Sequence, residues 1–421
     1  MSKKIKVLTL GDHPLSPSGV GTQTKYVIEA LLETERFEVV SLGGAIRHHN
    51  YDPILVEGHG QNWKIFPVDG YGSQEMLRSI IRNERPDIVW IMTDPRFWGW
   101  LWEMENEIRS LCPLVYYHVW DNYPAPMFNK RFYESNDYIA SISKLTQDIV
   151  RTVTPDIECV YIPHAVDNKM FAPLTKEQIE MLRAENLPED KDKFIVFWNS
   201  RNARRKQSGS LIFWWKEWLD ERNLHDKATL IMHTDPKDVH GQDLEHIVEH
   251  LGLTNRQVLF SMNKIDTSGL AALYNMADVV ISVSDAEGFG LSMQEAISCG
   301  IPIIATATGG MQDQLFTDSG EPCGIPLFPA AKSIIGSQEV PYIYEDRLSN
   351  SQVKSALSNM YDMGPEERRK LGNLGRNHAM TNFSMKRFKE QWVEFMLKVY
   401  EEQGSWSTRK NHNGIIFKEI A

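Results

Sequence analysis

The chain of 421 residues carries a net charge of −11, with 42% hydrophobic and 24% charged residues. This composition is typical of a soluble globular protein, and the length predicts two domains of ~150–200 residues each. Residues 1–170 hold 17 Lys and Arg against 22 Asp and Glu, and the remainder holds 28 against 34. Neither half is basic, which argues against broad electrostatic attraction to nucleic acid or to anionic lipid.

The first residues and the cysteines predict a cytoplasmic location. No apolar run approaches the ~20 residues that a membrane span requires, so no transmembrane segment is expected. Met1–Gly11 lacks the long apolar core of a signal peptide and is expected to form a first β-strand. The four cysteines are scattered and form no CxxC pair, which predicts reduced thiols.

In the first half of the chain, short β-rich runs alternate with helical patterns. The run Lys4–Leu10 precedes a Gly-rich loop and a predicted helix over Gln23–Glu33, and a second helical pattern covers Ser73–Asn83. Further predicted strands are Phe37–Leu42, Asp87–Met92, Leu114–Tyr117, Tyr138–Ser141 and Val160–Ile162. Such alternation predicts a parallel, doubly wound α/β sheet.

A polar stretch, Asp167–Lys193, precedes a second alternation of the same kind. Its predicted strands are Phe194–Trp198, Ala228–His233, Val258–Ser261, Val279–Val283 and Ile301–Ala305. A long helix is expected over Met385–Glu402, followed by a polar, extended tail. We therefore predict two Rossmann-like domains, over residues 1–170 and 194–383, with a linker over 171–193, a helix over 384–403 and a tail over 404–421.

The segment Ser284–Gly310 carries the strongest functional signal. It follows the apolar run Ala277–Val283 and predicts a Gly-rich turn, a helix and another strand. Such a turn presents unpaired backbone N–H groups at the positive end of a helix, which suits a phosphate. Glu287 lies in the turn and Glu295 lies in the helix. Two carboxylates that flank a phosphate site could hold hydroxyl groups on both sides, such as those of a sugar and a ribose.

The stretch E-G-F-G-L-S-x-x-E-A-x-x-C-G-x-P within this segment closely resembles the donor signature of retaining GT-B glycosyltransferases of family four, the glycosyl transferases group 1. The resemblance implies a GT-B architecture, in which two Rossmann-like doubly wound domains face each other across a cleft and a C-terminal helix crosses back to the first domain. The first domain would bind the acceptor and the second the nucleotide sugar. The implied reaction is retaining and metal-independent: the acceptor hydroxyl attacks from the front face, and the leaving phosphate accepts its proton.

The resemblance also implies roles for residues of the second domain. Glu295 would hold the ribose hydroxyls and Glu287 the hydroxyls of the donor sugar. Phe289, Gly290 and Leu291 would offer backbone N–H groups to the diphosphate. Met262 lies in a loop expected to face the base, which leaves a UDP-sugar and a GDP-sugar both open.

A basic run, Asn199–Lys206, follows the first predicted strand of the second domain. The family places an arginine and a lysine five residues apart here, and Arg201 and Lys206 match that spacing. Their cations would stabilise the diphosphate leaving group without a metal ion. In an alternative register Arg205 replaces Arg201. No metal and no tightly bound cofactor is expected.

Three features of the first domain are also implicated. Gly19 and Gly21 follow the first strand, where glycine permits close approach of the backbone to a ligand. His118 follows an apolar strand, and ligands bind at the carboxyl ends of strands. The resemblance implies that a histidine here contacts the transferred sugar or the phosphate, and the alternative is a hydrogen-bonded packing histidine. Asp121 would orient His118 or meet the acceptor.

The acceptor is left open by the sequence. The aromatic residues Trp98, Trp100 and Tyr123 would form a platform for it, or would pack at the start of a helix. A glycan and a glycolipid are the acceptors that the family implies, and a hydroxylated base of phage-type DNA is a further one. Two other functions stay open: a sugar-nucleotide epimerase of similar fold and a non-catalytic glycan-binding protein. The oligomeric state is not readable.

Overall fold

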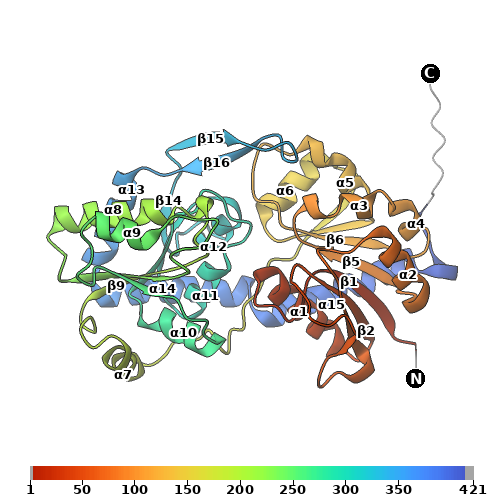
Figure 1. The fold of residues 1–421 in the computed structure, drawn as a ribbon, viewed down its shortest axis with the longest axis horizontal. Helices are drawn as coiled ribbons and strands as arrows, with labels where there is room; N and C mark the ends of the chain where they lie inside the picture. Colours follow the sequence, from red (N-terminus) through yellow and green to blue (C-terminus); the bar gives the residue numbers. More distant parts are fainter. Residues whose placement is uncertain (1–2, 413–421) are drawn as a thin grey trace. The chain divides into compact units, whose positions relative to one another are not determined.

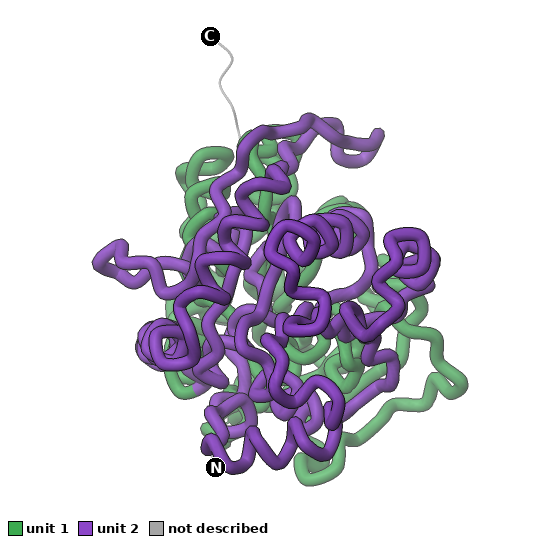
Figure 2. The backbone as a smooth tube through the Cα atoms, turned by 90° about the vertical axis from the view of Figure 1, so that its left-hand side faces the viewer, with its two compact units in different colours: residues 1–164, 386–421 green, residues 165–385 purple. Residues whose placement is uncertain are grey.

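The computed structural model describes residues 3–412, which divide into two compact units (Figures 1 and 2). Within the described range, the first unit comprises residues 3–164 and 386–412, and the second comprises residues 165–385. The first unit therefore takes its last helix from the far end of the sequence, whereas the second is continuous.

The described residues of the first unit form an eight-stranded sheet in the order β3-β4-β2-β1-β5-β6-β7-β8. All neighbouring strands run parallel except the short β3, which runs antiparallel to β4. Its strands are β1 Ile5–Asp12, β2 Phe37–Gly44, β3 Ile54–Leu55, β4 Trp63–Pro67, β5 Ile88–Met92, β6 Leu114–His118, β7 Tyr138–Ser141 and β8 Glu158–Tyr161. Its helices are α1 Gly19–Leu32, α2 Gln74–Glu84, α3 Gly99–Trp102, α4 Glu105–Arg109, α5 Lys130–Glu134 and α6 Lys144–Val153.

The described residues of the second unit form a parallel six-stranded sheet in the order β11-β10-β9-β12-β13-β14, and a separate two-stranded hairpin, β15–β16. The strands are β9 Phe194–Asn199, β10 Ala228–His233, β11 Val258–Ser261, β12 Val279–Ser282, β13 Ile303–Thr306, β14 Ile325–Leu327, β15 Ala331–Ile335 and β16 Ile343–Arg347. The helices are α7 Lys176–Asn186, α8 Ser208–Arg222, α9 Leu244–His250, α10 Thr267–Met276, α11 Leu291–Ser298, α12 Gln312–Leu315, α13 Asn350–Asp362 and α14 Gly364–Asn382. Helix α8 contacts both α9 and α13, and α11 contacts both α10 and α14 (Figure 1).

The predicted strands are present in both units because buried parallel strands are short, nearly continuous apolar runs. Strands β9 and β12, for example, lie within one residue of the predicted ranges. The segment expected as a linker contains α7 instead. Both units are Rossmann-like, with parallel sheets and helical connections.

Helix α15, Met385–Gln403, contributes a core residue to the first unit. Trp392 is fully buried, with its ring centroid 5.8 Å from that of Trp90 and 4.7 Å from that of Tyr117. Burying an aromatic side chain of this size stabilises a fold by several kcal/mol, on the order of ~3–5 by truncation to alanine. The first sheet therefore needs this distant helix to complete its core.

The tail departs from the expectation of an extended segment. After α15 the chain forms a 3-10 turn, Trp406–Thr408, and packs on the first unit. The buried Ser405 hydroxyl donates to Asp87 Oδ1 at 2.6 Å, and Trp406 Nε1 donates to the Pro86 carbonyl at 2.9 Å. Residues 404–412 are therefore anchored, and the rest of the predicted tail, 413–421, lies outside the described residues.

Candidate active site

The order of strands in the second sheet places two functional loops side by side. Strand β9 lies between β10 and β12, so the connections leave β9 and β12 in opposite directions. Ligands of open α/β sheets bind at such a switch point, beyond the carboxyl ends of the strands. The loop after β9 carries the basic turn Arg204–Lys206, and the loop after β12 carries Glu287.

Glu287 is the point where these loops meet. Its side chain is 11% exposed; it contacts Lys206 Nζ and Arg205 Nη1, the latter at 3.4 Å, and accepts a hydrogen bond from the Ser284 hydroxyl at 2.9 Å. Burial raises the pKa of Glu287, but the charges of Lys206 and Arg205 outweigh it and lower the pKa to about 2. Glu287 is therefore ionised and contacts two cations, Arg205 and Lys206, near the N-terminus of the next helix, α11.

The Gly-rich turn brings backbone N–H groups to the same place. Gly290 caps α11 with a φ of +88°, and a Cβ there would lie 2.8 Å from Cγ of Met311. Helix α11 starts at Leu291, so the N–H groups of Leu291 and Ser292 precede the first carbonyl of the helix, whereas Met293 donates its N–H to the Gly290 carbonyl at 3.0 Å. Phe289 is buried, and its carbonyl accepts a hydrogen bond from Gln314 Nε2 at 2.6 Å, which fixes the turn. An anion at this helix terminus would meet donors from both the backbone and the basic turn.

Glu295 lies farther along α11 in a different environment. The Tyr274 hydroxyl donates to Glu295 Oε2 at 2.6 Å, and Asn199 Nδ2 donates to the same hydroxyl oxygen at 2.8 Å. Burial raises the pKa of Glu295 to about 7, although the bond from Tyr274 opposes that shift. This carboxyl group is poised to accept from ligand hydroxyls when it is ionised.

The geometry distinguishes the two possible registers of the basic run. Arg201 is 61% exposed and pairs with Asp238, with Nε and Oδ2 2.6 Å apart. Arg205, in contrast, donates to the Ala286 carbonyl at 2.5 Å and lies beside Glu287. Arg205 rather than Arg201 therefore accompanies Lys206 at the Gly-rich turn. Met262, in the loop after β11, is 61% exposed.

Some residues of this arrangement were not singled out from the sequence. Tyr274 reaches Glu295 from α10, and Gln314 reaches the turn from α12. Gly310 donates its N–H to the Glu287 carbonyl at 3.0 Å, and a Cβ on it would lie 2.2 Å from the Gly288 carbonyl oxygen. A Gly-Gly pair after an apolar strand was a usable signal for Gly310, whereas the other two contacts depend on how the helices pack.

In the first unit, the loop after β1 leads into α1. Ser18 caps the helix by accepting from the Gly21 N–H at 2.9 Å and donates to Asp12 Oδ2 at 2.6 Å. A Cβ on Gly21 would lie 2.4 Å from the Ser16 hydroxyl oxygen, so this position requires glycine, while Gly19 is exposed in the first turn. Tyr71 donates to the other Asp12 oxygen at 3.0 Å.

The structure argues against the expected role of His118. The residue ends β6 as anticipated, but it is fully buried, and its ring nitrogens lie 2.9 Å from the Tyr116 hydroxyl and 2.7 Å from the Tyr133 hydroxyl. Burial lowers the pKa of His118 to about 3. His118 therefore matches the packing alternative in this structure: it is buried, and both of its ring nitrogens contact tyrosine hydroxyls. The His118 ring is thus hydrogen-bonded by two tyrosines, and Asp121 is half-buried.

The expected aromatic platform is also largely absent. Trp98 is fully buried in the hydrophobic core of the unit, and Trp100 is partly buried against it. Tyr123 is half-buried and donates its hydroxyl to Asp148. The neighbouring Phe97 is instead 42% exposed and stacks on Tyr71, with ring centroids 4.7 Å apart. Sequence alone could not tell which aromatic residue of the cluster faces outward.

A segment of the second unit matches a known family model. Residues 179–321 match the family model described as "Glycosyl transferases group 1". The matched segment contains the basic turn, the Gly-rich turn, Glu287 and Glu295. This segment of the second unit is similar to glycosyl transferases group 1.

Curated relatives of this chain include two bacterial enzymes. A D-inositol 3-phosphate glycosyltransferase from Xylanimonas cellulosilytica is 25% identical over 187 residues, which is 44% of this chain and 43% of the relative. N-acetyl-alpha-D-glucosaminyl L-malate synthase from Bacillus anthracis is 23% identical over 245 residues, which is 56% of this chain and 58% of the relative. The matched segments thus span about half the length of these relatives.

Solved structures match over nearly the whole chain. A sucrose-phosphate synthase from Thermosynechococcus elongatus superposes with a TM-score of 0.75 at 19% identity, covering 94% of this chain and 100% of that one. The Anabaena protein HepE, solved in complex with UDP and glucose, superposes with a TM-score of 0.67 at 17% identity, again covering 94% and 100%. The fold of this chain is GT-B.

Residues 3–412 hold neither a cluster of metal ligands nor a membrane-spanning helix. Within residues 3–412, we find no group of three or more His, Cys, Asp or Glu side chains placed to hold a metal ion. Over the same range, no helix is both long and apolar enough to cross a membrane.

Proposed function

We propose that this protein is a retaining, metal-independent glycosyltransferase that moves a sugar from a nucleotide-diphosphate sugar to a hydroxyl acceptor. The observation that carries the proposal is the convergence of Lys206 and Arg205 on Glu287 beside the first turn of α11. Two cations beside a helix N-terminus suit a diphosphate. Glycosyl transfer from such a donor needs this charge complement, since negative charge grows on the leaving group as the glycosidic bond breaks.

The second unit supplies the donor contacts. The diphosphate oxygens would accept from Lys206, Arg205 and the backbone N–H groups of Phe289, Gly290 and Leu291. Glu295 would hold ribose hydroxyls and Glu287 the hydroxyls of the transferred sugar. Losing one cationic contact to the leaving group would cost on the order of ~3 kcal/mol of transition-state stabilisation. The acceptor hydroxyl attacks the anomeric carbon from the face that the diphosphate leaves, and a diphosphate oxygen takes its proton.

The first unit would bind the acceptor. The exposed Phe97 ring, stacked on Tyr71, offers an apolar face for a sugar ring, and Asp12 offers carboxylate oxygens next to it. Glycan, glycolipid and a hydroxylated base of phage-type DNA are the acceptor classes to test. The four cysteines are free and buried, which fits a reducing compartment, so we place the reaction in the cytoplasm.

A thermal-shift panel tests the donor site. UDP, GDP, ADP and TDP are added with and without Mg²⁺ to the wild type and to Glu295→Ala, Arg205→Ala and Arg201→Ala. We expect one diphosphate to raise the melting temperature without metal, and the Glu295→Ala and Arg205→Ala substitutions to remove most of the shift. Arg201→Ala is the matched control, because Arg201 pairs with Asp238 away from Glu287, and should retain it.

Other outcomes would favour other functions. If no diphosphate shifts the melting temperature at concentrations well above millimolar, the enzymatic proposal fails and a glycan-binding protein becomes the better explanation. If the matching nucleotide sugar is converted to an isomer without any acceptor, the protein is an epimerase. A shift that requires Mg²⁺ would overturn metal independence alone.

A further inference from the structure

The β15–β16 hairpin is a projecting element of the second unit, inserted between β14 and α13 (Figure 1). It pairs with no other strand of the described residues. Strand alternation gives it two faces: Glu345 and Arg347 share one face, and Ile334, which is 72% exposed, lies on the other. Glu345 and Arg347 place charge at the base of the hairpin.

Glu345 joins the hairpin to the basic turn after β9. Its side chain is only 3% exposed, and both oxygens are bonded by Arg204, Nη1 to Oε2 at 2.8 Å and Nη2 to Oε1 at 2.5 Å. Such bidentate pairs are geometrically specific as well as strong. Arg204 is therefore engaged with the hairpin, while its neighbours Arg205 and Lys206 lie at Glu287.

Arg347 joins the hairpin to the loop after β12. Its Nη2 lies 2.8 Å from Glu345 Oε2, and its Nη1 contacts Asp285 Oδ2. The Asp285 side chain is 3% exposed, so its charge must be compensated locally. Backbone hydrogen bonds connect the same segments. Asp346 donates its N–H to the Asp285 carbonyl at 3.0 Å, and Asp285 donates its N–H to the Arg205 carbonyl at 2.8 Å.

These contacts bind three segments that are far apart in the chain. The basic turn is a single 3-10 turn, Arg204–Lys206, which has little stability of its own. Its shape must therefore come from tertiary contacts, and the hairpin supplies several of them. If the turn shifted, Arg205 and Lys206 would move away from the helix N-terminus.

We propose that Glu345 and Arg347 are positioning residues, which hold the basic turn in the geometry that binds the donor diphosphate. They act through Arg204 and Asp285 and touch no ligand themselves. This inference rests on the proposed function, because it assigns the diphosphate to Arg205 and Lys206. It gives the inserted hairpin a role in donor binding.

A double-mutant cycle on the full chain tests the inference. Glu345→Gln, Arg204→Gln and the double variant are titrated with UDP and with uridine by ligand-observed NMR, or with GDP and guanosine if GDP is the diphosphate that binds the wild type. We expect each single variant to weaken the diphosphate about tenfold, ~1.4 kcal/mol, and the nucleoside less than twofold. The double variant should be no weaker than the weaker single variant, because both substitutions break one contact.

Controls separate positioning from a general loss of structure. Ile334→Ser, on the other face of the hairpin, should bind both ligands as the wild type does, and Arg347→Gln should weaken the diphosphate alone. Unchanged diphosphate binding in Glu345→Gln, parallel loss of nucleoside and diphosphate, or additive losses in the double variant would each overturn the inference while leaving the proposed function standing. Failure of every diphosphate to bind the wild type would overturn both.

Discussion

Glu287 and Glu295 lie on the same Gly-rich motif yet have opposite protonation behaviour. Glu287 is held ionised by Lys206 and Arg205, which lower its pKa to about 2. Glu295 receives only a tyrosine hydroxyl, and burial raises its pKa to about 7. The residue type is identical, so the partners alone decide that one carboxylate is permanently charged and the other titrates near neutral pH.

We predict that nucleoside diphosphate binding strengthens with rising pH through the titration of Glu295. Only the ionised carboxylate accepts hydrogen bonds from two ribose hydroxyls, so affinity should fall by up to about tenfold for each pH unit below the pKa. The measurement is the dissociation constant from pH 5.5 to 8.5 for the wild type and Glu295→Gln.

The ratio of the two variants is the informative quantity, because a terminal phosphate itself titrates near pH ~6. A ratio that does not change with pH would contradict the prediction.

The raised pKa of Glu295 also has a consequence for stability. The folded state holds the Glu295 proton more tightly than the unfolded state, whose value is near 4.5, so this group's contribution to the free energy of unfolding should fall as pH rises from about 4.5 to 7.

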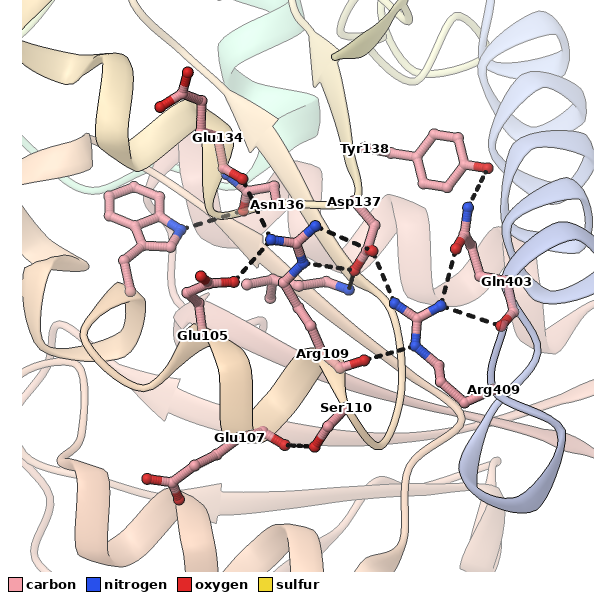
Figure 3. Close-up of polar contacts among 12 residues, drawn as sticks. Glu105, Glu107, Arg109, Ser110, Glu134, Asn136, Asp137, Tyr138, Gln403 and Arg409 are labelled. Atoms are coloured by element: carbon pink, nitrogen blue, oxygen red, sulfur yellow. Dashed lines mark hydrogen bonds and ion pairs between the residues drawn. The ribbon is translucent and has the colours of Figure 1, made fainter. Parts of the chain in front are cut away.

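At the scale of elements, the C-terminal segment after α15 is anchored by a buried arginine. Arg409, with a side chain 6% exposed, pairs with Asp137 at 2.8 Å and donates to the Arg109 carbonyl at 2.6 Å (Figure 3). Asp137 also accepts from the Leu114 N–H at 2.8 Å, where β6 begins. The segment thereby connects to the amino end of a central strand.

We predict that Arg409→Met lowers the free energy of unfolding of the first unit by about 2–4 kcal/mol, because Asp137 is left buried with one cation fewer. Chemical denaturation followed by tryptophan fluorescence measures the change. Lys386→Met, at a residue whose side chain is 85% exposed on α15, is the matched control and should change stability by less than ~0.5 kcal/mol. Equal stability of the two variants would show that the anchor contributes nothing.

At the scale of the whole molecule, the two units differ in continuity. The buried core of the second unit draws on residues from Phe194 to Met360. The first unit depends on Trp392, which is supplied from α15 after the second unit has been completed. The first unit therefore needs a contact between residues far apart in the sequence. Such a contact forms late in folding, because closing the long intervening loop costs conformational entropy.

We predict that a fragment of residues 165–385 unfolds cooperatively and binds the diphosphate, whereas a fragment of residues 1–164 does not fold. Adding the segment 385–412 in trans to the 1–164 fragment should restore native-like circular dichroism and tryptophan fluorescence to it. A cooperative transition of the 1–164 fragment alone would contradict the importance of α15.

Much of the fold could be predicted from the chain because apolar runs such as Val279–Ser282 are buried on both sides of a parallel sheet. The hairpin β15–β16 was missed, since β15 is largely exposed, β16 is mostly half-buried, and neither strand has that signal. The short β4 was missed as well: it ends at Pro67 and alternates between buried and half-buried residues. Local pattern thus predicts buried elements better than peripheral ones.

The candidate site divides in the same way. Sequence by itself determined the Gly-rich turn, its two glutamates and the basic run, because each depends on residue type and local spacing. Tertiary structure decided that Arg205 and not Arg201 meets Glu287, that tyrosines enclose His118, and that Glu345 lies against Arg204. These outcomes depend on which distant side chains share a space, and hence on burial and charge compensation that no local pattern records.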